Sequence, residues 1–426
     1  GAWDLETGSN NILIGIIDTG IATANDGSLN HPDLDDATRY ILGTDFVSDD
    51  ALPRDDHSHG THVAGIAAAE SNNAEGIAGV NWVSPVYVCK IFDSTGNGSQ
   101  SDVEAATIEI VDYAISNNLQ VVINMSAGWP DAHSALEDAV EYAHDNGMIF
   151  CLAVGNDYGD PVGFPAAYSD NFSSIIAVGS TDEDDTVSNF SSEGPEVTVV
   201  APGGDIFSTM PTYDVTSTDL GASKDYDEQS GTSMASPFVA GLASLVWSKE
   251  PLQNSEQVKD VIINTAIKLD TADFSNAWGY GRVDAEEAVA KAGWDIDLVY
   301  NSLDFIDIPE NETTARAIRF DVKSFHETEF EIISGPTGVF EVSFEGSTSL
   351  GKSTDYDTLR DAYIWISYTG VNDGDVHNGT VEVQCTQTQQ TWVLNITANT
   401  VQRPSSCVMM VLDQSNSMKD IRELMF

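Results

Sequence analysis

The sequence predicts an α/β domain, in which a mostly parallel sheet is sandwiched by helices, followed by a smaller all-β sandwich. Two observations carry this prediction. Over the first 293 residues, short β-branched runs that are apolar on both faces alternate with Ala-rich or amphipathic stretches, as parallel strands and covering helices do. After Gly293 the Ala-rich stretches stop, and apolar and polar residues alternate as in half-buried strands. We therefore expect three parts, residues 1–293, 294–400 and 401–426.

The first part supplies the strands and helices of the α/β domain. We expect strands at residues 12–18, 86–91, 120–125, 149–154, 175–178 and 197–200, and helices at residues 60–70, 101–117, 134–146 and 233–249. Ser101 and Ser134 are the predicted N-caps of the second and third helix, and Glu104 would complete a capping box with Ser101. Active sites in such folds lie beyond the carboxyl ends of strands, and both Asp18 and Asn156 follow a predicted strand end.

The second part carries roughly seven predicted strands, a number typical of a β-sandwich. They lie at residues 304–308, 317–322, 329–333, 340–344, 362–368, 380–386 and 391–397. This part is weakly similar to immunoglobulin-like accessory modules, and no motif in it predicts a catalytic site.

The third part begins with an apolar run that ends in Asp413-Gln414-Ser415-Asn416-Ser417. This motif resembles the opening of a von Willebrand A domain, where such oxygen-bearing side chains begin a site for a divalent metal such as Mg²⁺. Too few residues follow for the whole domain, so we expect a truncated start with an incomplete metal site. A plain turn rich in Ser and Asn is the alternative.

The charge of the chain is strongly acidic, with 17 Lys and Arg against 68 Asp and Glu and a formal net charge of −51. A polyanion repels nucleic acid and anionic lipid, so we expect neither as a partner. Salt screens such self-repulsion, with a Debye length of about 3 Å near 1 M, which suggests a halophilic or marine source. No run approaches the roughly 18 apolar residues needed to span a membrane.

Four cysteines are too few for a disulfide scaffold. Cys89 and Cys151 lie in apolar runs and are predicted to be buried free thiols. Cys385 and Cys407 could pair, and the sequence leaves this open. The chain opens directly into Trp3-Asp4-Leu5 without a signal peptide or an inhibitory pro-segment, so we expect upstream residues to have been removed or never included.

Three short segments, far apart in the chain, supply an acid, a base and a hydroxyl nucleophile. They are Ile16-Ile17-Asp18-Thr19-Gly20, His59-Gly60-Thr61-His62-Val63-Ala64-Gly65 and Gly231-Thr232-Ser233-Met234-Ala235-Ser236-Pro237. A serine is a poor nucleophile unless a base takes its proton, and an imidazole needs a carboxylate to orient it. Taken singly, Asp18 could cap a turn, His59 could be a surface residue and Ser233 could cap a helix.

The histidines in and just before the second segment also allow a zinc hypothesis, because His57, His59 and His62 lie within six residues. They lack the His-Glu-x-x-His spacing that places two ligands and a base on one helical face. We therefore expect His59 to be a base and His62 to pack one turn further along the helix.

The three segments, in the order Asp, His, Ser, resemble those of the subtilisin-like serine proteases, and the similarity runs from residue 1 to about residue 293. It implies a secreted serine endopeptidase in which Ser233 attacks, His59 moves the proton and Asp18 orients His59. Asn156, in Ala153-Val154-Gly155-Asn156, matches the family's side-chain donor to the oxyanion. The implied partners are protein or peptide substrates cleaved with broad specificity, and we expect a monomer.

The resemblance also implies where a substrate lies. Residues 126–128 match the segment that borders the S1 side, and residues 96–98 match its opposing partner, so an extended peptide would add between them as a strand. The implied substrate-binding residues are Gly96, Gly98, Ser126, Ala127, Gly128, Ala153, Gly155 and Gly163. An ordinary glycine-rich loop is the alternative for each segment.

A structural Ca²⁺ is the one cofactor that the resemblance implies. The implied ligands are all oxygens, from the side chains of Asp33 and Asn73 and the carbonyls of Ser71, Glu75 and Ile77. The N-terminal segment that adds a ligand in the family has no counterpart in this sequence.

One function of another class competes with the protease. A catalytically silent adhesion or scaffold protein would work through the modules after residue 293. The intact motifs argue against it, because a binding module needs none of the four polar groups at Asp18, His59, Asn156 and Ser233.

Overall fold

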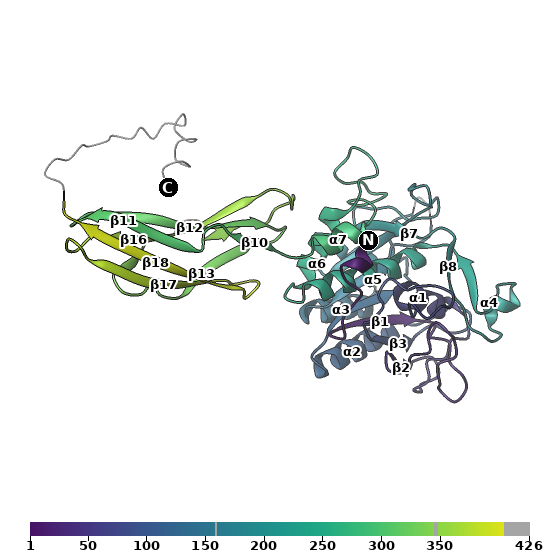
Figure 1. The fold of residues 1–426 in the computed structure, drawn as a ribbon. Helices are drawn as coiled ribbons and strands as arrows, with labels where there is room; N and C mark the ends of the chain where they lie inside the picture. Colours follow the sequence, from purple (N-terminus) through teal and green to yellow (C-terminus); the bar gives the residue numbers. More distant parts are fainter. Residues whose placement is uncertain (158–159, 345–347, 404–426) are drawn as a thin grey trace. The chain divides into compact units, whose positions relative to one another are not determined.

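The computed structural model describes residues 1–157, 160–344 and 348–403. They form two compact units, Gly1–Ala292 and the described residues from Gly293 onward (Figure 1). Unit 1 contains the predicted α/β fold, and its parallel sheet confirms that part of the fold class. Among the described residues, the helices are too short or too polar to cross a bilayer.

Unit 1 is built on a seven-stranded parallel sheet in the order β2-β3-β1-β4-β5-β6-β7. The strands are β1 (Ile12–Asp18), β2 (Tyr40–Asp45), β3 (Val86–Lys90), β4 (Gln120–Met125), β5 (Ile149–Ala153), β6 (Ile175–Thr181) and β7 (Val199–Pro202). A separate hairpin pairs β8 (Ile206–Thr209) with β9 (Tyr226–Gln229). The helices are α1 (His59–Ala68), α2 (Gln100–Ser116), α3 (Ser134–Asp145), α4 (Thr216–Asp219), α5 (Thr232–Lys249), α6 (Ser255–Thr265) and α7 (Ala285–Ala290), with 3-10 turns at Ala2–Asp4 and Ala166–Asp170.

The two faces of the sheet bury alternate residues of the same strand. In β1, Leu13 and Ile17 belong to the core cluster shared with α2 and α3, whereas Ile14 and Ile16 pack with α1 and Met234 of α5. All seven residues of β1 are buried. This double burial is why the strand is apolar on both faces, and it places Asp18 at the carboxyl edge of the sheet.

Two predicted N-caps were wrong. α2 begins at Gln100, and its N-cap is Ser99, whose side chain accepts a hydrogen bond from the Ser101 backbone. α3 begins at Ser134 with His133 as its N-cap, because the His133 ring accepts from the Ala135 backbone. In both cases a side chain preceding the predicted cap reaches the free N–H groups of the first turn.

The described strands of unit 2 form two sheets. One sheet has the order β10-β12-β16-β14, with β10 (Asp295–Leu298), β12 (Thr313–Lys323), β16 (Arg360–Thr369) and β14 (Phe340–Phe344). The other has the order β11-β18-β17-β13-β15, with β11 (Ser302–Pro309), β18 (Thr391–Val401), β17 (Val376–Cys385), β13 (Thr328–Ser334) and β15 (Ser349–Leu350). Pairings are antiparallel except between β11 and β18. One apolar cluster contains residues of both sheets, including Phe320 and Leu394.

The predicted start of a von Willebrand A-like domain lies outside the described residues, apart from residues 401–403. Cys407 lies outside them as well. Cys89, Cys151 and Cys385 are buried free thiols, which confirms the prediction for the first two.

Candidate active site

The predicted acid and base are in contact at the end of β1. Asp18 is the last residue of β1 and is fully buried, whereas His59 is the first residue of α1. His59 Nδ1 donates a hydrogen bond to Asp18 Oδ1 over 2.8 Å, and the Thr19 N–H donates to the same oxygen over 2.7 Å. Because a carboxylate only accepts, Nδ1 carries the proton, and the lone pair of Nε2 remains to accept another.

The electrostatics around His59 favour its charged form. Burial opposes charging of the ring, but the negative charge of Asp18, its hydrogen bond and the charge of Asp55 outweigh burial and raise the pKa of His59. A raised pKa makes the imidazole a better acceptor for the proton of a hydroxyl group.

The predicted nucleophile lies in the first turn of α5. The Ser233 hydroxyl donates to the Ser126 carbonyl over 3.1 Å, and the Ser126 hydroxyl donates back to the Ser233 carbonyl over 2.8 Å. No hydrogen bond joins the Ser233 hydroxyl to the His59 ring within the residues that the structure describes. Catalytic hydrogen bonds are often long or misaligned in a free enzyme and tighten when substrate binds.

Asn156 is exposed just beyond β5, and its orientation is fixed by Thr232. Its Oδ1 accepts hydrogen bonds from the Thr232 N–H over 2.8 Å and from the Thr232 hydroxyl over 3.0 Å. A backbone N–H only donates, so the amide oxygen must face Thr232 and the NH₂ group must face away. A Cβ at Gly231 would lie 3.4 Å from Asn156 Nδ2 and 3.6 Å from the Ser233 nitrogen. Two donors therefore border the same space beside the nucleophile.

Backbone hydrogen bonds bring together the segments expected to form the S1 side. Trp129 and Phe164 exchange two of these bonds, each 2.8 Å long, and the Gly163 N–H donates to the Val154 carbonyl over 3.0 Å. These contacts join the segments that contain residues 126–128, 153–155 and 163. Gly128 and Gly155 are close-approach positions, where a Cβ would lie 3.2 Å from the Phe164 carbonyl and 3.0 Å from Ser192 Oγ.

The backbone of the expected substrate-binding edge is available for pairing. Ala127 and Gly128 make no backbone hydrogen bond to the rest of the described chain, and Gly128 is exposed. On the opposing segment, Gly98 pairs with Phe92 in a single antiparallel bridge. A Cβ at Gly96 would lie 3.8 Å from Nε2 of His57, the residue two before the base, so this segment borders the loop that leads to His59.

The residues predicted to bind calcium are arranged differently from a cation site. Asp33 is fully buried, and its carboxylate already accepts hydrogen bonds from Asn73 Nδ2 over 2.7 Å, from the Ile77 N–H over 2.9 Å and from the Tyr226 hydroxyl over 2.9 Å. Asn73 thus turns its NH₂ group toward Asp33, while its oxygen accepts from the Glu75 N–H. This arrangement does not fit the predicted ion, since donors occupy three of the roughly four lone-pair sites of the carboxylate and the Asn73 oxygen accepts from the Glu75 N–H, and calcium stays a prediction.

The zinc alternative is not supported by the placement of His62. Its Nε2 faces the backbone carbonyls of Ile206 and Asp227, at 3.0 and 3.2 Å, rather than the rings of the other two histidines. Among the described residues, no group of three or more His, Cys, Asp or Glu side chains is placed to hold a metal ion.

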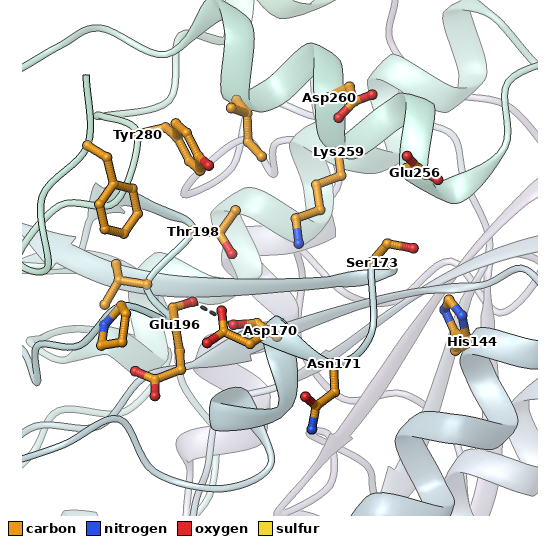
Figure 2. Close-up of a pocket in the computed structure, with 15 residues that line it drawn as sticks. His144, Asp170, Asn171, Ser173, Glu196, Thr198, Glu256, Lys259, Asp260 and Tyr280 are labelled. Atoms are coloured by element: carbon orange, nitrogen blue, oxygen red, sulfur yellow. Dashed lines mark hydrogen bonds between the residues drawn. The ribbon is translucent and has the colours of Figure 1, made fainter.

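A cavity of about 470 Å³ lies at the other edge of the sheet (Figure 2). Its lining includes Ser169, Asp170, Asn171 and Ser173 before β6 and Thr198 before β7, hence the amino ends of these strands. Lys259 points into it, and burial lowers the pKa of this ammonium to about 8 against the opposing influence of Asp260 and Asp170. None of the predicted site residues lines this cavity.

Sequence reasoning missed the polar residues that hold the site in place. Thr232 orients Asn156, and Asn124 Nδ2 donates to the Ser126 hydroxyl over 3.0 Å while its Oδ1 accepts from Ser236 over 2.7 Å. The signal for Thr232 and Ser236 was their position within the same segment as Ser233. Asn124 had no comparable signal, because it lies inside an apolar strand.

Comparison with known proteins identifies the family of the chain. The model of the subtilase family matches residues 9–281. The chain is 40% identical over 288 residues to the thermophilic serine proteinase of Bacillus sp. strain AK1, covering 68% of this chain and 64% of that one. It is 38% identical over 288 residues to thermitase of Thermoactinomyces vulgaris, with 68% and 91% covered. It is 38% identical over 292 residues to the halolysin-like extracellular serine protease Nep of Natrialba magadii, with 68% and 49% covered.

The solved structures give the same result. A protease from Pseudoalteromonas arctica PAMC 21717 matches with a TM-score of 0.58 and 28% identity, covering 68% of this chain and 93% of that one. The S41 psychrophilic protease matches with a TM-score of 0.55 and 30% identity, covering 65% and 92%. The chain therefore belongs to the subtilase family of serine endopeptidases.

Proposed function

We propose that this chain is a secreted endopeptidase of broad specificity that cleaves peptide bonds through an acyl-enzyme, with Asp18, His59 and Ser233 as its triad. The observation that carries the proposal is the 2.8 Å hydrogen bond between His59 Nδ1 and buried Asp18, at the carboxyl edge of the sheet. This bond leaves Nε2 as the free base of the pair. The name of the extracellular relative from Natrialba magadii supports secretion.

The chemistry assigns one step to each group. His59 Nε2 takes the proton as Ser233 Oγ bonds to the scissile carbonyl carbon, and Asp18 stabilises the imidazolium that forms. Asn156 Nδ2 and the Ser233 N–H donate to the negatively charged oxygen of the tetrahedral intermediate. The C–N bond then breaks, and His59 gives its proton to the leaving amine. Water, deprotonated by His59, hydrolyses the ester in the same way.

The substrate would bind as a strand between residues 126–128 and 96–98. The unpaired backbone groups of Ala127 and Gly128 support this binding mode. Because the substrate is held mainly by hydrogen bonds to its main chain rather than by contacts with its side chains, we expect broad specificity. A substrate strand would also compete for the Ser126 carbonyl, which the Ser233 hydroxyl occupies. Losing that acceptor would leave the hydroxyl to turn toward His59.

We further propose that residues 294–400 form an immunoglobulin-like sandwich, which the two sheets and the apolar cluster of unit 2 support. Residues 401–426 would begin a further domain. We also propose that the protein is a monomer and that it tolerates high salt. The net charge of −51 and the halolysin-like relative support the tolerance of salt.

A sulfonyl fluoride or phosphonate probe tests the proposed function. We expect labelling of the folded chain at Ser233, mapped by mass spectrometry, and loss of both labelling and casein hydrolysis in Ser233→Ala. Folded chain that takes up no probe would instead support the silent scaffold protein. A peptide-library cleavage profile separates broad from narrow specificity, because a dedicated processing protease would cut few sequences.

A further inference from the structure

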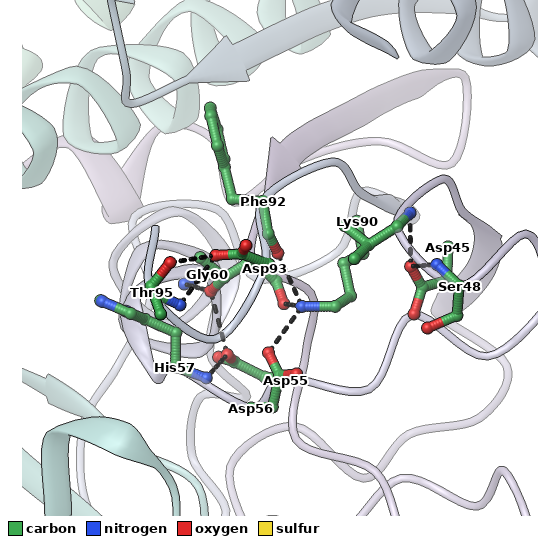
Figure 3. A network of polar contacts seen from close by, with 12 residues as sticks. Asp45, Ser48, Asp55, Asp56, His57, Gly60, Lys90, Phe92, Asp93 and Thr95 are labelled. Atoms are coloured by element: carbon green, nitrogen blue, oxygen red, sulfur yellow. Dashed lines mark hydrogen bonds and ion pairs between the residues drawn. The ribbon is translucent and has the colours of Figure 1, made fainter. Parts of the chain in front are cut away.

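A second buried carboxylate lies directly behind the acid and the base. Asp55, in the loop that leads into α1, is fully buried and accepts five hydrogen bonds. Oδ1 accepts from the Thr19 hydroxyl (2.9 Å), the His57 N–H (3.0 Å) and the Ser58 N–H (2.8 Å), and Oδ2 accepts from the Thr61 N–H (2.9 Å) and the Thr61 hydroxyl (2.6 Å). Figure 3 shows Asp55 in this network, with His57 and Gly60 beside it.

These hydrogen bonds connect the segment of the acid to that of the base. Thr19 follows Asp18, and its hydroxyl both donates to Asp55 and accepts from the Gly60 N–H over 2.8 Å. Gly60 follows His59. The Thr19 hydroxyl therefore links the residue after the acid to the residue after the base, and Asp55 joins the same hydroxyl to the Ser58 and Thr61 N–H groups at the start of α1.

Asp55 also caps the N-terminus of α1. Ser58 stands at the N-cap of α1 but makes no side-chain capping bond, whereas Asp55 takes the free N–H groups of Ser58 and Thr61. Ser58 has φ 114°, a left-handed conformation that costs a non-glycine residue about 1–3 kcal/mol and persists only where neighbours enforce it. The bond from its N–H to Asp55 is such a constraint, immediately before His59.

The other charged groups nearby bind partners other than Asp55. Lys90, on β3, is 2% exposed and donates to Asp56 Oδ1 over 2.7 Å and to the Thr19 and Phe92 carbonyls (Figure 3). The Arg54 guanidinium stacks over Tyr213 at 3.6 Å. His59 itself faces Asp18 on β1, the His57 ring at 6.4 Å and His62 on its own helix. Asp55 is thus the carboxylate besides Asp18 that acts on the His59 ring.

We propose that Asp55 is a positioning residue for the reaction, which holds His59 against Asp18 through Thr19 and Ser58 and stabilises the imidazolium by its charge. The proposal rests on the proposed protease function. It assigns Asp55 no contact with substrate: its effect passes through the backbone at Ser58 and Gly60 and through the electric field at His59.

Two variants separate the effect of the hydrogen bonds through Thr19 from the effect of the negative charge of Asp55. Asp55→Asn removes the negative charge and sets an NH₂ group against donors, whereas Thr19→Val keeps the charge and cuts the hydroxyl link. Misplacement of a catalytic group by about 1 Å costs up to about 100-fold, so we expect kcat to fall about 10- to 100-fold in both. Asp55→Asn should also move the acid limb of the pH profile of kcat/KM to lower pH, because an imidazolium without this neighbour loses its proton more readily.

Asp45→Asn is the matched control, because it removes another buried carboxylate that lies outside the site and accepts backbone N–H groups. It should lower the melting temperature but leave kcat and the acid limb unchanged. If Asp55→Asn and Thr19→Val lower only the melting temperature, Asp55 is a structural cap and the proposal fails. Should Asp55→Asn not fold, an unchanged kcat in Thr19→Val would overturn it alone. Wild-type chain that takes up no serine-directed probe would instead refute the protease function.

Discussion

Replacing Asn156 by alanine tests the proposed oxyanion site most directly. The change deletes the NH₂ group that the hydrogen bonds from Thr232 to Oδ1 turn away from α5. Loss of one such donor costs about 2.7–4 kcal/mol of activation free energy in subtilisin, a member of this same family, so we adopt that value rather than derive it. At 1.36 kcal/mol per factor of ten, kcat should fall about 10²- to 10³-fold.

The effect on folding should be much smaller. Asn156 is exposed, so water can replace its oxygen as the acceptor for Thr232, at a cost of about 1 kcal/mol. KM should change little, because the donor acts on charge that develops only in the transition state. A loss of activity without a matching loss of stability therefore distinguishes a missing donor from a damaged fold.

The assay measures kcat and KM on a chromogenic peptide, together with the melting temperature. Asn117→Ala is the control, because Asn117 is also exposed and its amide only caps α2 through the Tyr113 carbonyl. A variant Asn156→Ala with the kcat of the wild type would refute the assignment. So would an equal loss of kcat in Asn117→Ala.

Three further results are expected. Ser233→Ala should lose activity by several orders of magnitude and keep its melting temperature; an active variant would exclude Ser233 as the nucleophile. Burial lowers the pKa of His62 to about 4, so below its ordinary pKa near 6.5 only the unfolded chain gains a proton. Stability should fall by about 3 kcal/mol as pH falls from 6.5 to 4, and His62→Gln should flatten this dependence in denaturant titrations. With a net charge of −51, the melting temperature should rise with NaCl toward 1 M; a fall would contradict the halophilic hypothesis.

The core of the α/β fold was readable from the sequence because its strands are buried on both faces. β1 and β4 have the predicted bounds, because every residue of the two strands except Gln120 is buried. β2 was missed because it lies at the sheet edge, where only some residues are buried and the apolar run is broken. The cap of α2 was predicted at Ser101 rather than Ser99, because the hydroxyl group of either residue can cap a helix. The two hydroxyl groups share a hydrogen bond of 2.6 Å.

The residues of the candidate site also differ in whether the sequence could predict them. Asp18, His59, Asn156 and Ser233 lie at or just beyond strand ends and helix starts, where distinctive sequence segments mark them. Among their supports, Thr19 and Thr232 lie in the same segments, whereas Asp55 and Asn124 carry no such mark, because a hydrogen bond forms across any separation in sequence. Thr19 and Asp55 are 36 residues apart, and Thr232 and Asn156 are 76 apart.

This difference follows from what each kind of residue must satisfy. A nucleophile or a base needs one residue type at one spacing, so its segment is distinctive even when read alone. A supporting carboxylate such as Asp55 needs only burial and enough donors, and those donors come from whichever loops the fold brings together. Sequence can therefore point to the reacting groups, whereas the geometry that aligns them can be read only once the sheet has assembled.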